Sequence, residues 1–414
     1  MNFFDFSTIR SGRSFSLSLC IFTVYCLTNI LRWLPVIEIQ MPIVLVCYFL
    51  LLQSCDKNGI SRVITVSLIL IVFDYLFVFL QGGMRNDSLI NSIGANYTIF
   101  VSFFPILYVV SGNFAKIERE RFFNFVLLIC LITAITTIIG TFTYESPCRE
   151  LATPDNLEMD RLYKTKNIGG YGFIYFLVLL VPYILRELLQ KFSLIKAVLL
   201  VVFGFCILRS EYTTALLMTL IGIAVVFLIQ SKSKLLRLAV FVVVIAAIVS
   251  MQDILVWASS IISESSDTMM RRFDMMSDYS EYGAAADDDM GIRILLYMQS
   301  INAFLHNPFL GNLLSFTPRP LGGHSEILDY LGGSGLFGII VFVLLFRFLK
   351  KKTAMRRINF QDPFIKSSMI VAFLIALLNT FLAPELYYAI LIIPLLVDYE
   401  TKAKRSIQLA THAK

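Results

Sequence analysis

The chain has 414 residues, of which 57% are hydrophobic and only 15% are charged, and its formal net charge is +6. Soluble domains carry about 25% charged residues, so this composition excludes an ordinary soluble protein and indicates a chain embedded in a bilayer. The positive charge gives no reason to expect nucleic acid as a partner, because basic residues gathered at one membrane face produce the same excess.

Apolar runs of about 20 residues, the length that crosses the hydrocarbon core as a helix, recur along nearly the whole chain. We count twelve, and we predict an all-α integral membrane protein in which residues 1–414 form a single polytopic domain. The runs lie near residues 14–33, 36–54, 63–81, 96–112, 122–142, 169–186, 194–208, 213–230, 236–251, 331–349, 367–383 and 385–399.

The distribution of basic residues predicts the orientation of these spans. With a cytoplasmic N-terminus, the cytoplasmic segments contain 24 of the 35 Lys and Arg residues, including the run Lys350-Lys351-Lys352, and the opposite segments contain the other 11. Cytoplasmic loops of membrane proteins are enriched in Lys and Arg. We therefore predict that both termini are cytoplasmic.

Two hydrophilic segments interrupt the apolar pattern, and both are predicted to face outward. The smaller covers residues 143–168, and the larger covers residues 252–332 between the ninth and tenth spans. A loop of the second length among very short ones is usually functional, because loops carry binding and catalytic groups while the helices position them. We therefore look for chemistry in residues 252–332.

The end of the larger segment predicts two helices. The first carries Arg293 in an amphipathic pattern, and Pro308 and Gly311 follow it as stop signals. The second is predicted to begin at about Ser325, whose side chain would cap it, and to continue into the tenth span. This arrangement would place His324 at the outer mouth of the helix bundle.

Arginines and one histidine supply the predicted chemistry. Arginine binds phosphate oxygens in a bidentate fork, and histidine accepts protons near neutral pH. A base beside such arginines indicates a transfer reaction whose leaving group is a lipid diphosphate. The arginines predicted to reach the outer face are Arg209, Arg271, Arg272, Arg293 and Arg319.

These motifs resemble a known family. The strings "GIRILLYMQSINAFLHNPFLGN" and "GGHSEILDYLGGSGLFG" resemble the C-terminal hallmark of bacterial O-antigen polymerases and ligases, the Wzy and WaaL superfamily. The matching positions are Arg293, Asn307 to Gly311, His324-Ser325 and Gly335 to Gly338. The string "NIGGYGFIYF", Asn167 to Phe176, is also similar to polysaccharide polymerases of this group. The basic residue of a short outer turn in the family has its counterpart in "RSEYTT", where Arg209 precedes the serine.

The resemblance implies a metal-independent membrane glycosyltransferase with a GT-C-like helical fold and no cofactor, in the bacterial inner membrane with a periplasmic active site. Its partners would be membrane lipids and two undecaprenyl-diphosphate-linked glycans, one as donor and one as acceptor. Whether a chain-length regulator also binds is left open. His324 and Arg293 would be catalytic, with His324 deprotonating or orienting the acceptor hydroxyl. The diphosphate would be bound by Arg209, Arg272, Arg293 and Arg319.

The resemblance leaves polymerase and ligase both open. We favour polymerase because "GGYGFIY" is more similar to the polymerases. The basic residues of segment 143–168 would serve a second lipid diphosphate or a core phosphate equally well. A lipid-linked oligosaccharide flippase is the alternative from another class, since twelve spans are common among carriers. However, carriers usually have related halves, whereas here the only long loop lies between spans nine and ten.

Several of these residues also have simple structural interpretations. A lone histidine at a helix start often only makes a helix-end hydrogen bond, and Arg209 with Glu211 would suit a turn pair. The run Asp287-Asp288-Asp289 is more typical of a solvated surface than of a metal site. Asp74, in the middle of a predicted span, indicates a structural partner more strongly than a catalytic role.

Overall fold

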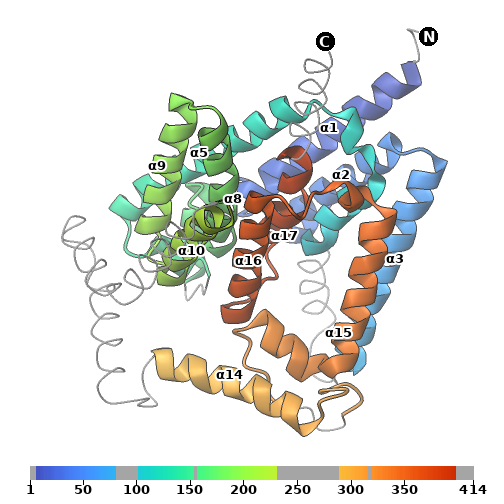
Figure 1. Ribbon diagram of the computed structural model, residues 1–414, viewed down its shortest axis with the longest axis vertical. Coiled ribbons are helices and arrows are strands. Elements are labelled where there is room, and N and C mark those ends of the chain that lie inside the picture. Colours follow the sequence, from blue (N-terminus) through green and yellow to red (C-terminus); the bar gives the residue numbers. More distant parts are fainter. Residues whose placement is uncertain (1–5, 81–100, 153–155, 231–288, 316–318, 398–414) are drawn as a thin grey trace.

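The computed structural model describes residues 6–80, 101–152, 156–230, 289–315 and 319–397 (Figure 1). All regular structure in these ranges is helical, which confirms the all-α class for them. Three of the described helices are long and apolar enough to cross a membrane. They are α5 (Arg119–Thr143), α8 (Tyr171–Gln190) and α15 (Glu326–Lys352).

Other helices complete the described bundle. They are α1 (Phe6–Leu27), η1 (Val36–Gln40), α2 (Met41–Ser54), α3 (Lys57–Leu80), η2 (Asn113–Lys116), α6 (Pro147–Glu150), α7 (Leu157–Thr165), α9 (Leu194–Arg209), α10 (Thr213–Gln230), α14 (Asp289–His306), η3 (Ala354–Arg357), α16 (Pro363–Leu378) and α17 (Pro384–Leu391), with one more at Val101–Ser111. Each predicted apolar run coincides at least in part with a helix, except 236–251, which lies outside the described residues. The number of membrane crossings stays a prediction.

Helix α8 occupies the centre of the bundle. It packs against α9, α10, α16 and α17, and 72% of its apolar window is buried, compared with 28% in α15. A helix that is apolar on all sides is typical of a buried position, and Tyr175, Phe176 and Tyr183 of α8 are fully buried. Helix α15 instead keeps Phe342 and Leu344 exposed, which suits a surface in contact with lipid.

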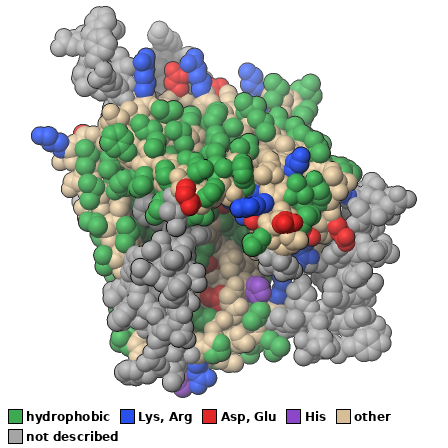
Figure 2. Space-filling model, turned by 180° about the vertical axis from the view of Figure 1, so that it is seen from behind, with side chains coloured by type: hydrophobic (Ala, Val, Ile, Leu, Met, Phe, Trp, Pro, Cys, Tyr) green, Lys and Arg blue, Asp and Glu red, His purple; other side chains and the backbone are tan. Residues whose placement is uncertain are grey.

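Contacts between helix ends define two opposite ends of the bundle. At one end, the Asn113 side chain donates to the Ser54 carbonyl at 3.1 Å, and Arg119 Nη1 donates to the Leu395 carbonyl at 3.2 Å. Lys and Arg side chains are visible along the corresponding upper edge of Figure 2, above a broad hydrophobic surface. We call this end the basic end; it includes Lys57, Arg62, Arg119, Arg121, Lys191, Lys196, Lys350, Lys351 and Arg356.

The opposite end, which we call the site end, contains the described parts of the segments that the sequence predicts to face outward, residues 143–152, 156–168, 289–315 and 319–332. There the Tyr171 hydroxyl donates to the Thr380 carbonyl at 2.7 Å, and Arg32 pairs with Glu385 at 2.6 Å. Helix α14 lies across this end, at the bottom of Figure 1, while α1 begins at the basic end. Below the hydrophobic surface, Figure 2 shows a recess in which acidic and histidine side chains are visible.

Helix α15 is broken at Gly335, where φ is 60° and ψ is −160°. The loop after α14 enters this break: the amide of Leu336 donates to the Pro308 carbonyl and that of Phe337 to the Phe309 carbonyl, both at 2.9 Å. These bonds satisfy amides that the interrupted helix leaves without a helical acceptor. The two halves of the C-terminal motif, Asn307 to Gly311 and Gly335 to Gly338, are therefore one packed unit.

Substitution of Gly335 by alanine is expected to destabilise this unit. A Cβ atom there would lie 2.4 Å from the Phe309 carbonyl oxygen, in a backbone conformation that side chains rarely adopt. We expect Gly335→Ala to lower the free energy of unfolding by about 1–3 kcal/mol from backbone strain, with the clash in addition. Thermal unfolding of the detergent-solubilised protein measures the change.

Gly112→Ala is the matched control, because Gly112 has φ of 71° but no atom within 4 Å of the position of a Cβ. Gly112→Ala should therefore lose stability from backbone strain but not from a clash. If both variants lose the same stability, the close approach of the loop to α15 contributes nothing.

Candidate functional site

The start of α15 holds His324 at the site end. Ser325 caps the helix as predicted, since its hydroxyl accepts a hydrogen bond from the Leu328 amide at 3.2 Å. Asp329 Oδ2 in turn accepts from the Ser325 amide at 3.2 Å. His324 itself is exposed, so its imidazole stands beside a fixed helix start and is accessible to a ligand.

Close packing brings the His324 segment to the first half of α14. The Gly322 amide donates to the Ser300 hydroxyl at 2.9 Å, and a Cβ atom on Gly322 would collide with the Leu296 carbonyl. Leu296 lies one helical turn after Arg293, since residues three apart are neighbours along a helix. Glycine at position 322 thus permits the segment before His324 to pack closely on the helix that carries Arg293.

Arg293 is half-buried, and its charge acts on the phenol groups of Tyr175 and Tyr297. Tyr297 lies one turn later on α14, and its hydroxyl donates to the Leu378 carbonyl at 2.7 Å. Tyr175 belongs to the central helix α8. The guanidinium therefore lies where α14 meets the bundle.

The non-helical segment after α16 joins these elements. The Glu326 amide donates to the Asn379 carbonyl, and Glu326 Oε2 accepts from the Phe381 amide, both at 3.1 Å. The Asn379 side chain donates to the Tyr175 hydroxyl at 3.4 Å. Backbone groups freed between α16 and α17 thus hold the start of α15 against α8.

Arg319 and Arg293 are separated by the length of α14. Arg319 is exposed, and its Nη2 lies 3.2 Å from Nδ1 of His306, the last residue of α14. Arg293 is near the first turn, and thirteen residues of helix span about 20 Å. The binding of one diphosphate by both arginines stays a prediction.

Arg209 is buried at the end of α9 and has partners inside the protein. Its Nη2 donates to the Thr141 carbonyl at 2.6 Å, and its guanidinium lies 4.3 Å from the centre of the Phe142 ring. These contacts tie α9 to the end of α5, so Arg209 has a packing role that needs no ligand. Its role in diphosphate binding stays a prediction.

Other predicted residues fall where the structure says nothing of them. Arg271, Arg272, Asp287 and Asp288 lie outside the described residues, as do the side chains of Asp289 and Asp74. Within the described part of the chain, no cluster of His, Cys, Asp and Glu has the composition of a metal site.

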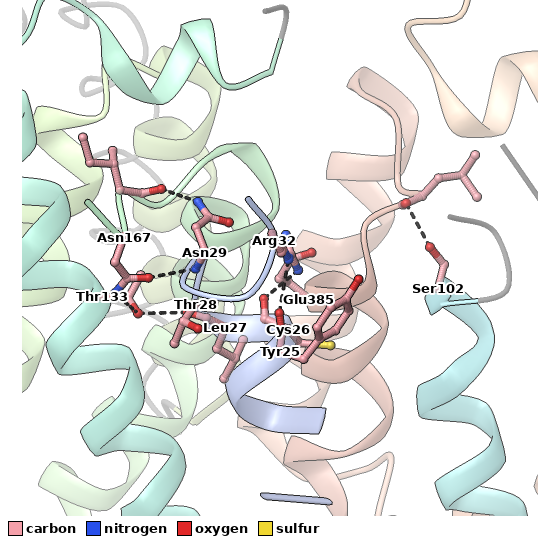
Figure 3. Close-up of polar contacts among 12 residues, drawn as sticks. Tyr25, Cys26, Leu27, Thr28, Asn29, Arg32, Ser102, Thr133, Asn167 and Glu385 are labelled. Atoms are coloured by element: carbon pink, nitrogen blue, oxygen red, sulfur yellow. Dashed lines mark hydrogen bonds and ion pairs between the residues drawn. The ribbon is translucent and has the colours of Figure 1, made fainter. Parts of the chain in front are cut away.

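A cavity of about 780 Å³ lies at the site end between α1, α8 and α17. Arg32 and Glu385 form an ion pair in its wall (Figure 3), with Glu385 only 3% exposed. Arg32 Nη2 also donates to the Cys26 carbonyl at 2.7 Å. The guanidinium, which is charged under all ordinary conditions, therefore has a carboxylate partner beside the cavity.

Gly169 to Phe173, the last five residues of the string "NIGGYGF", also line this cavity. Asn167 has φ of 56°, and its Oδ1 accepts from the Asn29 amide at 2.8 Å (Figure 3). The Gly169 amide donates to the Thr137 hydroxyl at 2.8 Å. A Cβ atom on Gly172 would lie 2.5 Å from Glu385 Oε2, so only glycine lets α8 start against the carboxylate.

Tyr171 connects the cavity with the Arg293 region. It lines the cavity, and its ring centre lies 4.6 Å from that of Tyr175, which is within reach of the Arg293 charge. Arg32 carries little signal in the sequence, since it is only a charged residue near the end of the first apolar run, residues 14–33. The two regions are neighbours at one end of the bundle.

Cys148 in segment 143–168 is expected to be unreactive. It is 1% exposed, and burial, followed by the Glu211 carboxylate, raises the pKa of its thiol to about 12. Since only the thiolate reacts, about one molecule in ten thousand is reactive at pH 8. Mass spectrometry of the purified protein after maleimide treatment should find Cys148 modified only after denaturation, whereas an Arg161→Cys variant, exposed in the same segment, should react at once. Rapid native modification of Cys148 would contradict the packing of this segment.

Comparisons with known proteins do not assign the chain to a family. No protein-family model matches the sequence, and a comparison with curated proteins returns no match.

Proposed function

We propose that the protein is a membrane glycosyltransferase that polymerises undecaprenyl-diphosphate-linked oligosaccharide repeat units at the periplasmic face of the bacterial inner membrane. The observation that supports the proposal is the packing of Gly322, two residues before His324, against Leu296, three residues after Arg293. A base and a cation on two packed segments at the mouth of a bundle suit a transfer from a diphosphate leaving group.

In the proposed reaction the acceptor hydroxyl oxygen attacks the anomeric carbon of the donor sugar from the face opposite to the diphosphate. The new C–O bond forms as the bond to the diphosphate oxygen breaks, so the anomeric configuration inverts. The hydroxyl proton passes to the imidazole of His324, and the departing diphosphate is stabilised by the guanidinium of Arg293. A positioned base contributes about 10²–10⁴-fold.

The orientation in the membrane is part of the proposal. The basic end would face the cytoplasm, because Lys and Arg gather on that side of membrane proteins, and the site end would face the periplasm. In a cysteine-free background, Arg161→Cys should react with an impermeant maleimide added to spheroplasts, and Lys350→Cys should not. The reverse pattern would exclude a periplasmic site.

A transporter is the second candidate, and the break in α15 is the observation that favours it. Discontinuous helices form the substrate sites of many carriers, and the interruption at Gly335 is of this kind. However, the break is filled by the chain's own residues 308–312, so its backbone groups already have partners. We therefore favour the transferase.

Surface polysaccharide on a gel tests the function. Cells that lack the gene should show lipid A core carrying a single repeat unit, and the wild-type gene should restore a ladder of longer glycans. If the single-unit band is also missing and polymer accumulates on the lipid carrier, the protein is a ligase, which would overturn the polymerase proposal.

A further inference from the structure

The cavity beside α8 has no part in the proposed chemistry at His324 and Arg293, and its lining combines apolar side chains with a few charged and polar groups. Its two basic residues are each held by an acid: Arg32 by Glu385 and Lys164 by Asp160, at 2.6 and 2.7 Å. Among the described lining residues, Arg32, Lys164 and Glu385 are the charged ones. Each basic residue of the lining therefore already has a carboxylate partner.

A diphosphate is a poor ligand for such a wall. Phosphate oxygens only accept hydrogen bonds, and they would approach the Glu385 carboxylate, which is fixed against Gly172. Placing a negatively charged diphosphate beside this carboxylate in a poorly solvated site costs free energy. An anionic group would instead be attracted to Arg293, outside this cavity.

Hydroxyl groups match the wall better, because each one donates and accepts. The first turn of α8 from Gly170 to Phe173 lines the cavity, and the amides of a first helical turn have no helical acceptor. Glu385 offers carboxylate oxygens beside them. Tyr25 and Tyr171 add flat rings, on which the C–H faces of a sugar ring can pack.

The volume of the cavity also suits sugar rings. About 780 Å³ falls within the ~300–1,000 Å³ range of small-molecule sites, which leaves room for more than one sugar ring. Tyr171 lies both in the cavity wall and against Tyr175, so a glycan held here has a short path to the α15 start. We propose that this cavity binds uncharged sugar residues of the acceptor glycan and directs its terminal hydroxyl toward His324, an inference that rests on the proposed function.

Direct binding tests the inference without any turnover. The probe is the lipid-free oligosaccharide of one to three repeat units, released by mild acid from the lipid carrier of the host cells. Saturation-transfer NMR on the full-length protein in nanodiscs should detect its binding. Gly172→Ala, which displaces the Glu385 carboxylate, should weaken binding at least about tenfold, equivalent to about 1.4 kcal/mol.

Gly204→Ala is the matched control, because no atom lies within 4 Å of its Cβ position, and it should bind the oligosaccharide like the wild type. Tyr171→Leu, which removes a flat ring at similar bulk, should also lose binding and serves if Gly172→Ala does not fold. His324→Ala and Arg293→Ala should keep binding, since both residues lie outside the cavity lining.

The two proposals fail in different ways. If the wild type elongates glycans but both cavity variants bind the oligosaccharide normally, the sugar site is wrong and the polymerase stands. If the oligosaccharide binds as expected and no elongation occurs, the polymerase is wrong and the sugar site stands. Displacement of the oligosaccharide by undecaprenyl phosphate in the Arg293→Ala variant would show that the cavity prefers the anionic lipid, which overturns the inference.

Discussion

His324→Ala is expected to abolish the ladder of long glycans and to reduce the rate of elongation about 10²–10⁴-fold, the contribution of a positioned general base. Membranes from complemented cells, supplied with lipid-linked repeat units, provide the rate. Expression and elution profile should match the wild type, because His324 is exposed and outside the core.

Arg293→Ala should reduce elongation by a similar factor, about 10²–10³-fold, because it removes a preorganised cation from the leaving diphosphate. Arg293→Lys should recover only part of the rate, since an ammonium cannot form the bidentate fork. His306→Ala is the control: His306 is also an exposed histidine of the site end, but it lies at the far end of α14. Equal losses in His306→Ala and His324→Ala would contradict the proposed base.

Glu385→Ala is expected to destabilise the whole bundle. It removes the partner of a charged guanidinium in the cavity wall, and breaking a buried ion pair costs about 3–5 kcal/mol. The same change frees the start of α17 from the loop after α1. Denaturation of the purified protein, followed by far-UV circular dichroism, measures the loss.

A double-mutant cycle isolates the ion pair. Arg32→Met/Glu385→Ala should lose less stability than the sum of the two single variants, because the uncompensated charge is gone. Glu118→Gln is the control, since its pair with Arg121 is exposed and such pairs contribute about 0–1 kcal/mol. Strict additivity of Arg32→Met and Glu385→Ala would mean that the pair contributes nothing.

Local signals in the sequence predicted local structure correctly. Ser325 is a good cap, and its hydroxyl does bond to the Leu328 amide. The stop signals Pro308 and Gly311 follow the end of α14 at His306. Such features depend on residues within one or two turns, so periodicity and capping preferences are sufficient to find them.

Features that join distant residues were not predictable in this way. Arg32 and Glu385 are more than 350 residues apart, and only the packing of α1 against α17 makes them partners. The break at Gly335 depends on a loop that enters α15 from outside it. Arg319 and Arg293 are both predicted to bind the diphosphate, but Arg319 lies beside His306 at the end of α14 and Arg293 lies near its start.

The motif "NIGGYGF" was singled out by resemblance, and the structure supplies a physical reason for its composition. Gly172 stands against the Glu385 carboxylate, and Asn167 fastens the loop after α1. Neither partner is near the motif in sequence. The glycines therefore reflect the close approach of α8 to α17 rather than flexibility of the segment.

Reconstitution of the purified protein in lipid vesicles tests the central claim most directly. The only substrate supplied is undecaprenyl-diphosphate-linked repeat unit, without lipid A core, nucleotide sugar or metal ion. We expect glycans of increasing length on the lipid carrier, with one undecaprenyl diphosphate released for each bond formed, and no products with His324→Ala. Movement of the substrate across the bilayer without any new glycosidic bond would contradict the transferase and identify a transporter.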